Sequence, residues 1–339
     1  MTQQFEKGRS IVSKIKGLLL TLSIAIVATL LGHFFPIIGS AIFAMLIGMV
    51  LNNCIQLPQT LKPGIQFSSK KILHYSIIVL GFTLSFQSIG SIGLKSLPIL
   101  IVTLLVALVI VTVCVKLLKI DTHTGILIGV GTSICGGSAI AATSPIIKAK
   151  DEIIAFSLST VFLFNLVAVI IFPPIGHFLH MSQEAFGFFS GTAINDTSSV
   201  VAASALYGSK ALEVATIVKL TRTLFIIPIT IILALWVTQR QEAQKQGERP
   251  TIIRAVPGFI IWFIVASLIS TLFNFSHEVI QIFKTIALFL ITIALAGVGL
   301  SVKFSQFKKA GLRPILLGLL TWAALIVTSL IVLGLIGML

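Results

Sequence analysis

Two segments of small and polar residues lie in a part of the chain that is otherwise apolar enough to cross a membrane. They cover residues 131–145 and 191–204, and each runs from a Gly-Thr pair to a Ser-x-x-Ala-Ala pattern, with one extra residue in the second. A lipid-facing helix gains nothing from such residues, because each unsatisfied polar group costs several kcal/mol in hydrocarbon. Paired, glycine-interrupted segments of this kind indicate a binding site for a transported solute.

Helices broken within these two segments would expose backbone groups to a ligand. A half-helix that begins at a break presents free N–H groups and about half a positive charge, which suits an oxyanion. Hydroxyl side chains would add further donors. For the glycines, the alternative is close packing between helices. The predicted substrate contacts in the two segments are Thr132, Ser133, Cys135, Gly136, Gly137, Ser138, Asn195, Thr197, Ser198 and Ser199.

Asp196 is the only acidic residue at the centre of a predicted membrane segment. An ionised side chain at that depth costs at least a few kcal/mol, so its carboxylate needs a partner or a proton. Asp196 is therefore predicted either to couple transport to H⁺ or Na⁺ or to form a structural ion pair.

Lys219 and Arg222 lie two to three turns inside the next apolar run and, three residues apart, share one helical face. A cationic pair facing a hydroxyl-rich site would bind an oxyanion, for which arginine offers a two-pronged hydrogen-bonding group. The alternative is that the two cations neutralise Asp196 and Glu213. We include Lys219 and Arg222 among the predicted substrate contacts.

Enzymatic chemistry is not predicted. Ser133 or Cys135 could be a nucleophile, but no deep histidine is close to either in sequence. No phosphate-binding Walker loop is present, and the three cysteines lack the spacing of a metal or redox motif. No cofactor is expected, apart from H⁺ or Na⁺ as a coupling ion.

The composition sets the class of fold that must position these residues. The chain has 339 residues, 56% of them hydrophobic and 10% charged, with a mean hydropathy of +1.10. Apolar runs of about 20 residues, the length that crosses a bilayer, recur from end to end. We predict an all-α, polytopic membrane protein of about nine to eleven transmembrane helices, with inverted repeats and two broken or re-entrant helices meeting at the midplane.

The net charge of +14 does not indicate a nucleic-acid partner, because most lysines and arginines lie in short loops between apolar runs. This is the positive-inside pattern of inner-membrane proteins. It predicts a multi-pass protein of the cell membrane with a cytoplasmic N-terminus and an extracytoplasmic C-terminus. The first apolar run is predicted to be a retained span and not a cleaved signal peptide. The predicted spans are 17–35, 38–54, 72–90, 96–118, 153–178, 210–238, 255–274, 280–302 and 314–338.

The two polar segments, within 123–147 and 184–208, permit two geometries. If both cross the membrane there are eleven spans, and Lys148 and Lys150 lie outside. If both are re-entrant hairpins there are nine spans, these lysines stay inside, and the two hairpins enter from opposite faces. Broken backbone at such depth must be covered by protein or line a wet cavity.

A short internal echo predicts a duplicated architecture. Residues 81–85 followed by 98–100 recur with the same spacing as 297–301 followed by 314–316. The predicted topology gives the two copies opposite orientations, as in the inverted repeats of secondary transporters.

The chain is predicted to divide at a polar linker. Residues 1–238 form a membrane part that carries both polar segments, and 239–254 form a cytoplasmic linker. Residues 255–339 form C-terminal membrane helices that echo 72–118.

The string GTSICGGSAIAATSPIIKAKDE, followed by an apolar span and then GTAINDTSSVVAASALYG, resembles the YeiH-type conserved hypothetical membrane proteins. These are classed as a family of sulfate exporters, and the resemblance covers nearly the whole chain. It implies an inverted-repeat transporter with broken helices, related to cation/proton antiporters and bile-acid-type symporters. Gly137 stands where asparagine is expected in many relatives, and Asn195 where histidine is expected.

Together these features predict a secondary transporter of a small anion, such as sulfate, sulfite or an organosulfonate. It would work by alternating access in the export direction, coupled to H⁺ or Na⁺. The alternatives are a cation/H⁺ antiporter that uses Asp196, and a passive anion channel. The expected partners are the anion and the lipid bilayer, with a homodimer as an open possibility.

Overall fold

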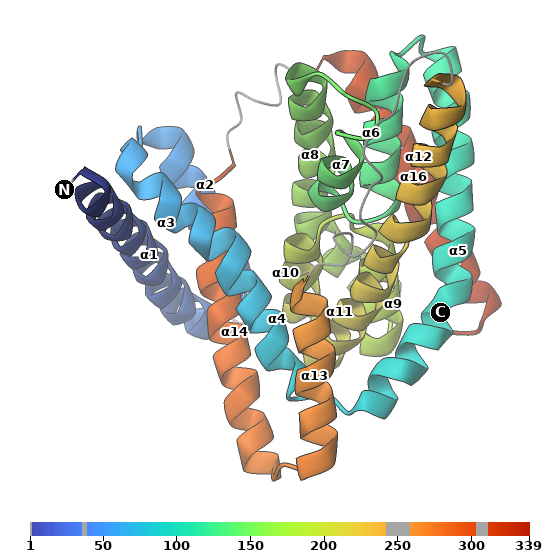
Figure 1. The fold of residues 1–339 in the computed structure, drawn as a ribbon. Helices are drawn as coiled ribbons and strands as arrows, with labels where there is room; N and C mark the ends of the chain where they lie inside the picture. Colours follow the sequence, from blue (N-terminus) through green and yellow to red (C-terminus); the bar gives the residue numbers. More distant parts are fainter. Residues whose placement is uncertain (1, 36–38, 242–257, 303–310) are drawn as a thin grey trace. The chain divides into compact units, whose positions relative to one another are not determined.

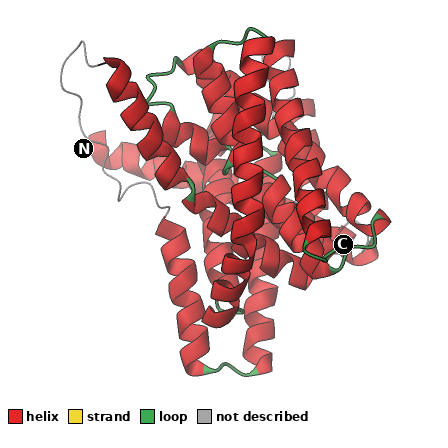
Figure 2. Cartoon of the chain, turned by 90° about the vertical axis from the view of Figure 1, so that its right-hand side faces the viewer, coloured by secondary structure: helices red, strands yellow, loops and turns green. Residues whose placement is uncertain are grey.

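The computed structural model describes residues 2–35, 39–241, 258–302 and 311–339, and within these ranges it contains helices and loops without a strand (Figure 2). Among the described residues, six helical stretches are long and apolar enough to cross a membrane. Large apolar side chains on them are exposed, including Leu105, Ile170 and Val327. A helix that is apolar on its outer face suits a lipid environment. The predicted all-α, polytopic membrane fold is confirmed.

The helices keep the labels of Figure 1. They are α1 (Thr2–Phe34), α2 (Gly39–Cys54), the 3₁₀-helix η1 (Gln59–Leu61), α3 (Lys62–Phe67), the π-helix η2 (Ser68–Ile72), α4 (Leu73–Gly81), α5 (Phe86–Leu117), α6 (Thr122–Ser133), α7 (Gly137–Thr143), α8 (Asp151–Phe178), α9 (Gln183–Ala193), α10 (Thr197–Tyr207), α11 (Ser209–Leu224), α12 (Ile226–Gln241), α13 (Gly258–Phe273), α14 (His277–Gly299) and α16 (Leu312–Leu335).

The chain folds as two compact units, each built from two separate stretches of sequence. Unit 1 comprises Met1–Ser88 and Phe259–Phe304, and unit 2 comprises Ile89–Gly258 and Ser305–Leu339. The predicted linker at 239–254 lies almost wholly outside the described residues. Each copy of the sequence echo begins in unit 1 and continues into unit 2.

Within unit 1, α4 and α14 are antiparallel neighbours (Figure 1). Phe82, just after α4, stacks on Phe283 in the first half of α14, with ring centroids 4.9 Å apart. Gly297, near the end of α14, lies against Ser69, which precedes α4. The first parts of the two sequence copies, 81–85 and 297–301, therefore end helices that run in opposite directions.

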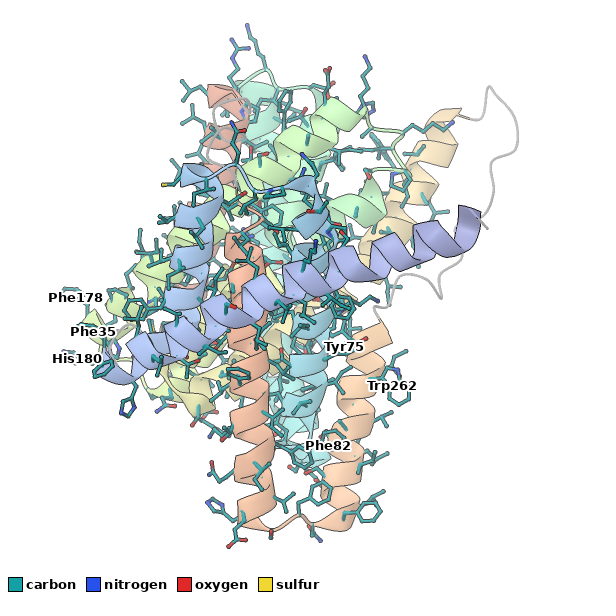
Figure 3. The ribbon with its side chains drawn as sticks, turned by 90° about the vertical axis from the view of Figure 1, so that its left-hand side faces the viewer. Phe35, Tyr75, Phe82, Phe178, His180 and Trp262 are labelled. Carbon is teal, nitrogen blue, oxygen red and sulfur yellow. The ribbon has the colours of Figure 1, made fainter. Side chains whose placement is uncertain are left out.

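Unit 1 is held by close backbone contacts. Helices α1 and α3 meet at Gly17 and Gly64, where a methyl group on Gly17 would lie 2.2 Å from the carbonyl oxygen of Leu61. Such small-residue contacts replace the hydrophobic effect as the basis of helix packing in lipid. Tyr75 of α4 and Trp262 of α13, both labelled in Figure 3, are 49% and 60% exposed.

Two predicted helix boundaries were wrong. The predicted spans 38–54 and 72–90 left the residues between them as a connection, but the α-helix α3 begins there at Lys62, where Pro63 suits the first turn of a helix. The span 72–90 was expected to be continuous, but α4 ends at Gly81. The hydroxyl of Ser85 then caps α5 by accepting the backbone N–H of Ser88 at 3.1 Å.

Unit 2 is organised around α8. Its 28 residues span about 42 Å, enough to cross about 30 Å of hydrocarbon. Short connections join its first residue to α7 and its last residue to α9. Both polar segments are thus attached to α8, one at each end, and in Figure 1 α6 and α7 lie toward one end of α8 and α9 toward the other.

Candidate functional site

The first polar segment folds as a hairpin, formed by α6 and α7, which we call hairpin 1. The side chain of Asp121 caps α6 by accepting the Thr124 N–H at 3.1 Å. Ile140 of α7 packs against Gly131 of α6. A continuous helix would separate residues nine apart by about 13 Å, so the chain must turn back between α6 and α7.

The second polar segment, α9 and α10, also folds back on itself and is called hairpin 2. Tyr207, the last residue of α10, donates its hydroxyl hydrogen to the Met181 carbonyl oxygen at 2.6 Å. The ring of Tyr207 stacks on Phe186 near the start of α9 with centroids 3.8 Å apart. The two ends of hairpin 2 therefore lie together, and its tip is at residues 194–196.

The hairpins enter from opposite ends of α8, and their tips meet near its middle. Asn165, at the midpoint of α8, accepts the backbone N–H of Asn195 at 3.1 Å. A methyl group on Gly136 would lie 3.4 Å from the Asn195 carbonyl oxygen and 3.5 Å from the Asp196 Cβ. Of the two geometries left open by the sequence, the structure has the re-entrant one.

The position of each break follows from local sequence. Gly136 adopts φ = +67° and ψ = −128°, a conformation that side chains with a Cβ rarely adopt, and α7 begins directly after it. In hairpin 2, Ile194 to Asp196 leave the helical region, and Asp196 caps α10. The glycine in one tip and the asparagine and aspartate in the other are residue types that favour such breaks.

Replacing Gly136 with alanine should destabilise the protein by about 1–3 kcal/mol, because the added Cβ strains the backbone at the tip. The measurement is thermal unfolding of the purified protein in detergent. Gly90→Ala is the control. Gly90 is an exposed position of α5, and its added methyl group would meet no heavy atom within 4 Å. An unchanged melting temperature in Gly136→Ala would contradict the strained tip.

Lys219 and Arg222 of α11 hold the two tips together. The Lys219 ammonium donates to the carbonyl oxygens of Ile134 at 2.9 Å and Ile194 at 3.0 Å, one in each tip. Arg222 likewise reaches both hairpins. Its guanidinium donates to the carbonyl oxygens of Thr132, Ser133, Thr192 and Ile194.

These contacts satisfy carbonyl groups that a helix end leaves free. The last four carbonyl groups of a helix lack intrahelical partners and carry about half a negative charge, so cations are favoured there. Lys219 and Arg222 are 0% and 2% exposed and neutralise the ends of α6 and α9 at once. In the structure both side chains face the polar segments. Their predicted contact with substrate stays a prediction.

The alternative that these cations pair with carboxylates is not what the structure has. Within the described ranges the only ion pair closer than 4.0 Å joins Lys210 to Glu213 on the surface of α11. No described acidic side chain pairs with Lys219 or Arg222. Among the described residues, the two buried positive charges at the tips are therefore balanced by peptide dipoles and, without a direct ion pair, by the nearby carboxylate of Asp196.

Asp196 is held by the start of α10 instead. Its carboxylate accepts the backbone N–H groups of Ser198 at 3.0 Å and Ser199 at 3.4 Å, and also the Ser198 hydroxyl. Asp196 is half-buried, so a proton or ion could reach it from one side. The sequence predicted that the free N–H groups at the start of a half-helix would bind an oxyanion. At the start of α10 these groups bind the Asp196 carboxylate instead.

Most of the predicted contacts gather at the tips. Thr132, Ser133, Cys135 and Asn195 are buried there. Gly137 and Thr197 are partly exposed, and Ser138 is exposed.

Two residues at the tips were not among the predicted site residues. The indole N–H of Trp322, on α16, donates to the Ala193 carbonyl oxygen at 3.1 Å, a further free group at the end of α9. The second residue is Asn165, whose side chain forms a hydrogen bond with the backbone of a hairpin tip. Its position at the middle of an apolar span was the signal for that role.

The whole chain has close relatives of known sequence. Residues 16–318 match the family described as Conserved hypothetical protein 698. A UPF0324 membrane protein of Streptococcus pyogenes serotype M18 is 44% identical over 94% of this chain and 96% of its own length. UPF0324 membrane proteins of Streptococcus agalactiae serotype V and Streptococcus pneumoniae strain R6 are each 43% identical. They cover 96% and 95% of this chain and 98% and 97% of their own lengths. No solved structure matches the chain significantly.

Proposed function

The chain belongs to the Conserved hypothetical protein 698 family of membrane proteins, and from this premise we propose that it is a secondary transporter of a small anion. The substrate class is sulfate, sulfite or an organosulfonate, moved by alternating access in the export direction. The transport site lies where the two hairpin tips meet.

The observation that carries this proposal is the pair of buried cations shared by the tips. Lys219 and Arg222 contribute two positive charges, and each helix C-terminus contributes about half a negative charge. The ends of α6 and α9 therefore offset about one of the two charges. When Asp196 carries a proton, the remaining positive charge favours an anion over a cation at this depth.

Asp196 supplies a means of coupling. When it is ionised, its carboxylate adds a negative charge close to the tips and opposes a second anion. When it binds a proton, that opposition disappears and the site favours an anion. Anion binding and proton binding are then linked.

The positions of basic residues support an orientation. In the re-entrant geometry Lys116, Lys119, Lys148 and Lys150 all lie at the open end of hairpin 1. The positive-inside pattern assigns that end to the cytoplasm, which agrees with a cytoplasmic N-terminus.

The test is counterflow in proteoliposomes. Vesicles containing purified protein are loaded with unlabelled sulfate, sulfite or taurine, and uptake of the labelled anion is followed. A carrier produces transient uphill accumulation of label, whereas a passive channel produces only equilibration. The proposal fails if no anion accumulates above protein-free vesicles, and Asp196-dependent Na⁺/H⁺ exchange in that case would identify a cation/H⁺ antiporter.

A further inference from the structure

Four buried polar side chains at the tips keep hydrogen-bonding groups that no described residue satisfies. Thr132, Ser133, Asn165 and Asn195, here called the polar cluster, are each at most 2% exposed. The unpartnered atoms are the two hydroxyl oxygens, Nδ2 of Asn165 and both amide atoms of Asn195. An unpaired buried polar group costs about 1–3 kcal/mol, so several of them at one place call for a partner.

The residues of the polar cluster belong to one connected set of hydrogen bonds. The Asn195 N–H bonds Asn165 Oδ1, which joins hairpin 2 to the middle of α8. Arg222 donates to the carbonyl oxygens of Thr132 and Ser133 and also to that of Ile194, the residue before Asn195. One guanidinium group therefore spans the distance between the two sides of the cluster.

The groups of the polar cluster that lack a hydrogen-bond partner among the described residues are mainly donors. Because Asn165 Oδ1 accepts a backbone N–H, the amide orientation is fixed and Nδ2 is the free atom. The two hydroxyl groups and the Asn195 Nδ2 can also donate. Lys219 uses two of the three N–H groups of its ammonium in hydrogen bonds to the tips, so it too can donate once more.

We propose that the polar cluster binds an oxyanion with at least three oxygens on one central atom, and that Asn165 selects it. This inference rests on the proposed function and specifies its substrate site. A carboxylate has about four lone-pair sites, fewer than the donor hydrogens of the two hydroxyl groups, the two Nδ2 groups and Lys219 together, and a halide would require all of these donors to converge on one atom. A metal cation is disfavoured by Lys219 and Arg222 at the same place.

Asn165→Asp is the sharpest variant, because it keeps Oδ1 for the Asn195 N–H and exchanges only the free donor for a negatively charged acceptor. We expect the variant to fold and to bind sulfate about tenfold more weakly or worse, since a hydrogen bond to a charged group contributes about 1.5–3 kcal/mol. Binding is measured as thermal stabilisation by sulfate over chloride at constant ionic strength.

Thr132→Val provides a second test that does not depend on Asn165. It removes an unpartnered hydroxyl at nearly constant shape, so the melting temperature should not fall while sulfate binding weakens several-fold. Ser157→Ala is the matched control. Ser157 is also buried with a hydroxyl that the described residues leave unpaired, but it lies on α8 about 12 Å before Asn165 along the helix axis.

The outcomes separate this inference from the proposed function. Weaker sulfate binding in Asn165→Asp and Thr132→Val, with Ser157→Ala unchanged, supports the polar cluster. Equal binding in wild type and both variants overturns the cluster and leaves anion transport standing. If no oxyanion stabilises the wild type or competes with labelled sulfate in counterflow, both the cluster and the proposed function are wrong.

Discussion

Replacing Arg222 with alanine should abolish anion counterflow and expose the thiol of Cys135 to water-soluble maleimides. Cys135 lies in the tip of hairpin 1 and is buried, at 3% exposure. Arg222 donates to carbonyl groups in both tips, and without it those of Thr132, Ser133 and Thr192 each lose a donor. Each loss costs about 1–3 kcal/mol, enough in total to release the tips from α11.

Labelling is measured in a background in which Cys54 and Cys114 are replaced, so that Cys135 is the only thiol. Lys210→Ala is the control. It lies on the same helix but belongs to an exposed ion pair, which contributes at most about 1 kcal/mol. Maleimide labelling of Cys135 that is as slow in Arg222→Ala as in wild type would show that Arg222 does not hold the tips.

The replacement Asp196→Asn should leave the protein folded but remove the dependence of transport on a pH gradient. Asparagine caps helices about as well as aspartate, so the new side chain can still accept the backbone N–H groups of Ser198 and Ser199. The amide cannot take up a proton, so the link between proton and anion is lost. The measurement is labelled sulfate uptake driven by a pH gradient, compared with counterflow at equal pH on both sides.

Asp121→Asn is the matched control, because Asp121 caps α6 in the same manner at the open end of hairpin 1. It should retain the response to the pH gradient. If Asp196→Asn responds to the gradient as the wild type does, Asp196 is not the coupling residue. The same comparison with a Na⁺ gradient decides between the two coupling ions.

The break points of the hairpins could be predicted because they depend on local chemistry. Gly136 permits a backbone conformation that other residues avoid, and Asp196 is a helix cap by residue type. That the segments turn back, and do not cross, could not be decided. The difference lies in long-range contacts, such as Tyr207 with Met181, which leave no periodic pattern in the sequence.

The partners of the buried charges were the least predictable feature. Spacing places Lys219 and Arg222 on one face of a helix, but it does not say which oxygen atoms they meet. Carboxylates are visible in a sequence, whereas free carbonyl groups at helix ends appear only once the breaks are located. The contact of Trp322 could not be predicted for the same reason, since its partner is a carbonyl oxygen at the end of α9.

Lys219 bonds one carbonyl oxygen from each hairpin, and this sharing makes the two hairpins compete. If one tip withdraws, the ammonium loses a partner and its attraction for the remaining tip increases, because a buried charge with fewer ligands binds each of them more strongly. If both tips withdrew, the Lys219 ammonium would be left without these partners in a medium of low polarity, which is unfavourable. In the proposed transporter, a single side chain would thus penalise simultaneous opening to both sides of the membrane and would limit leak.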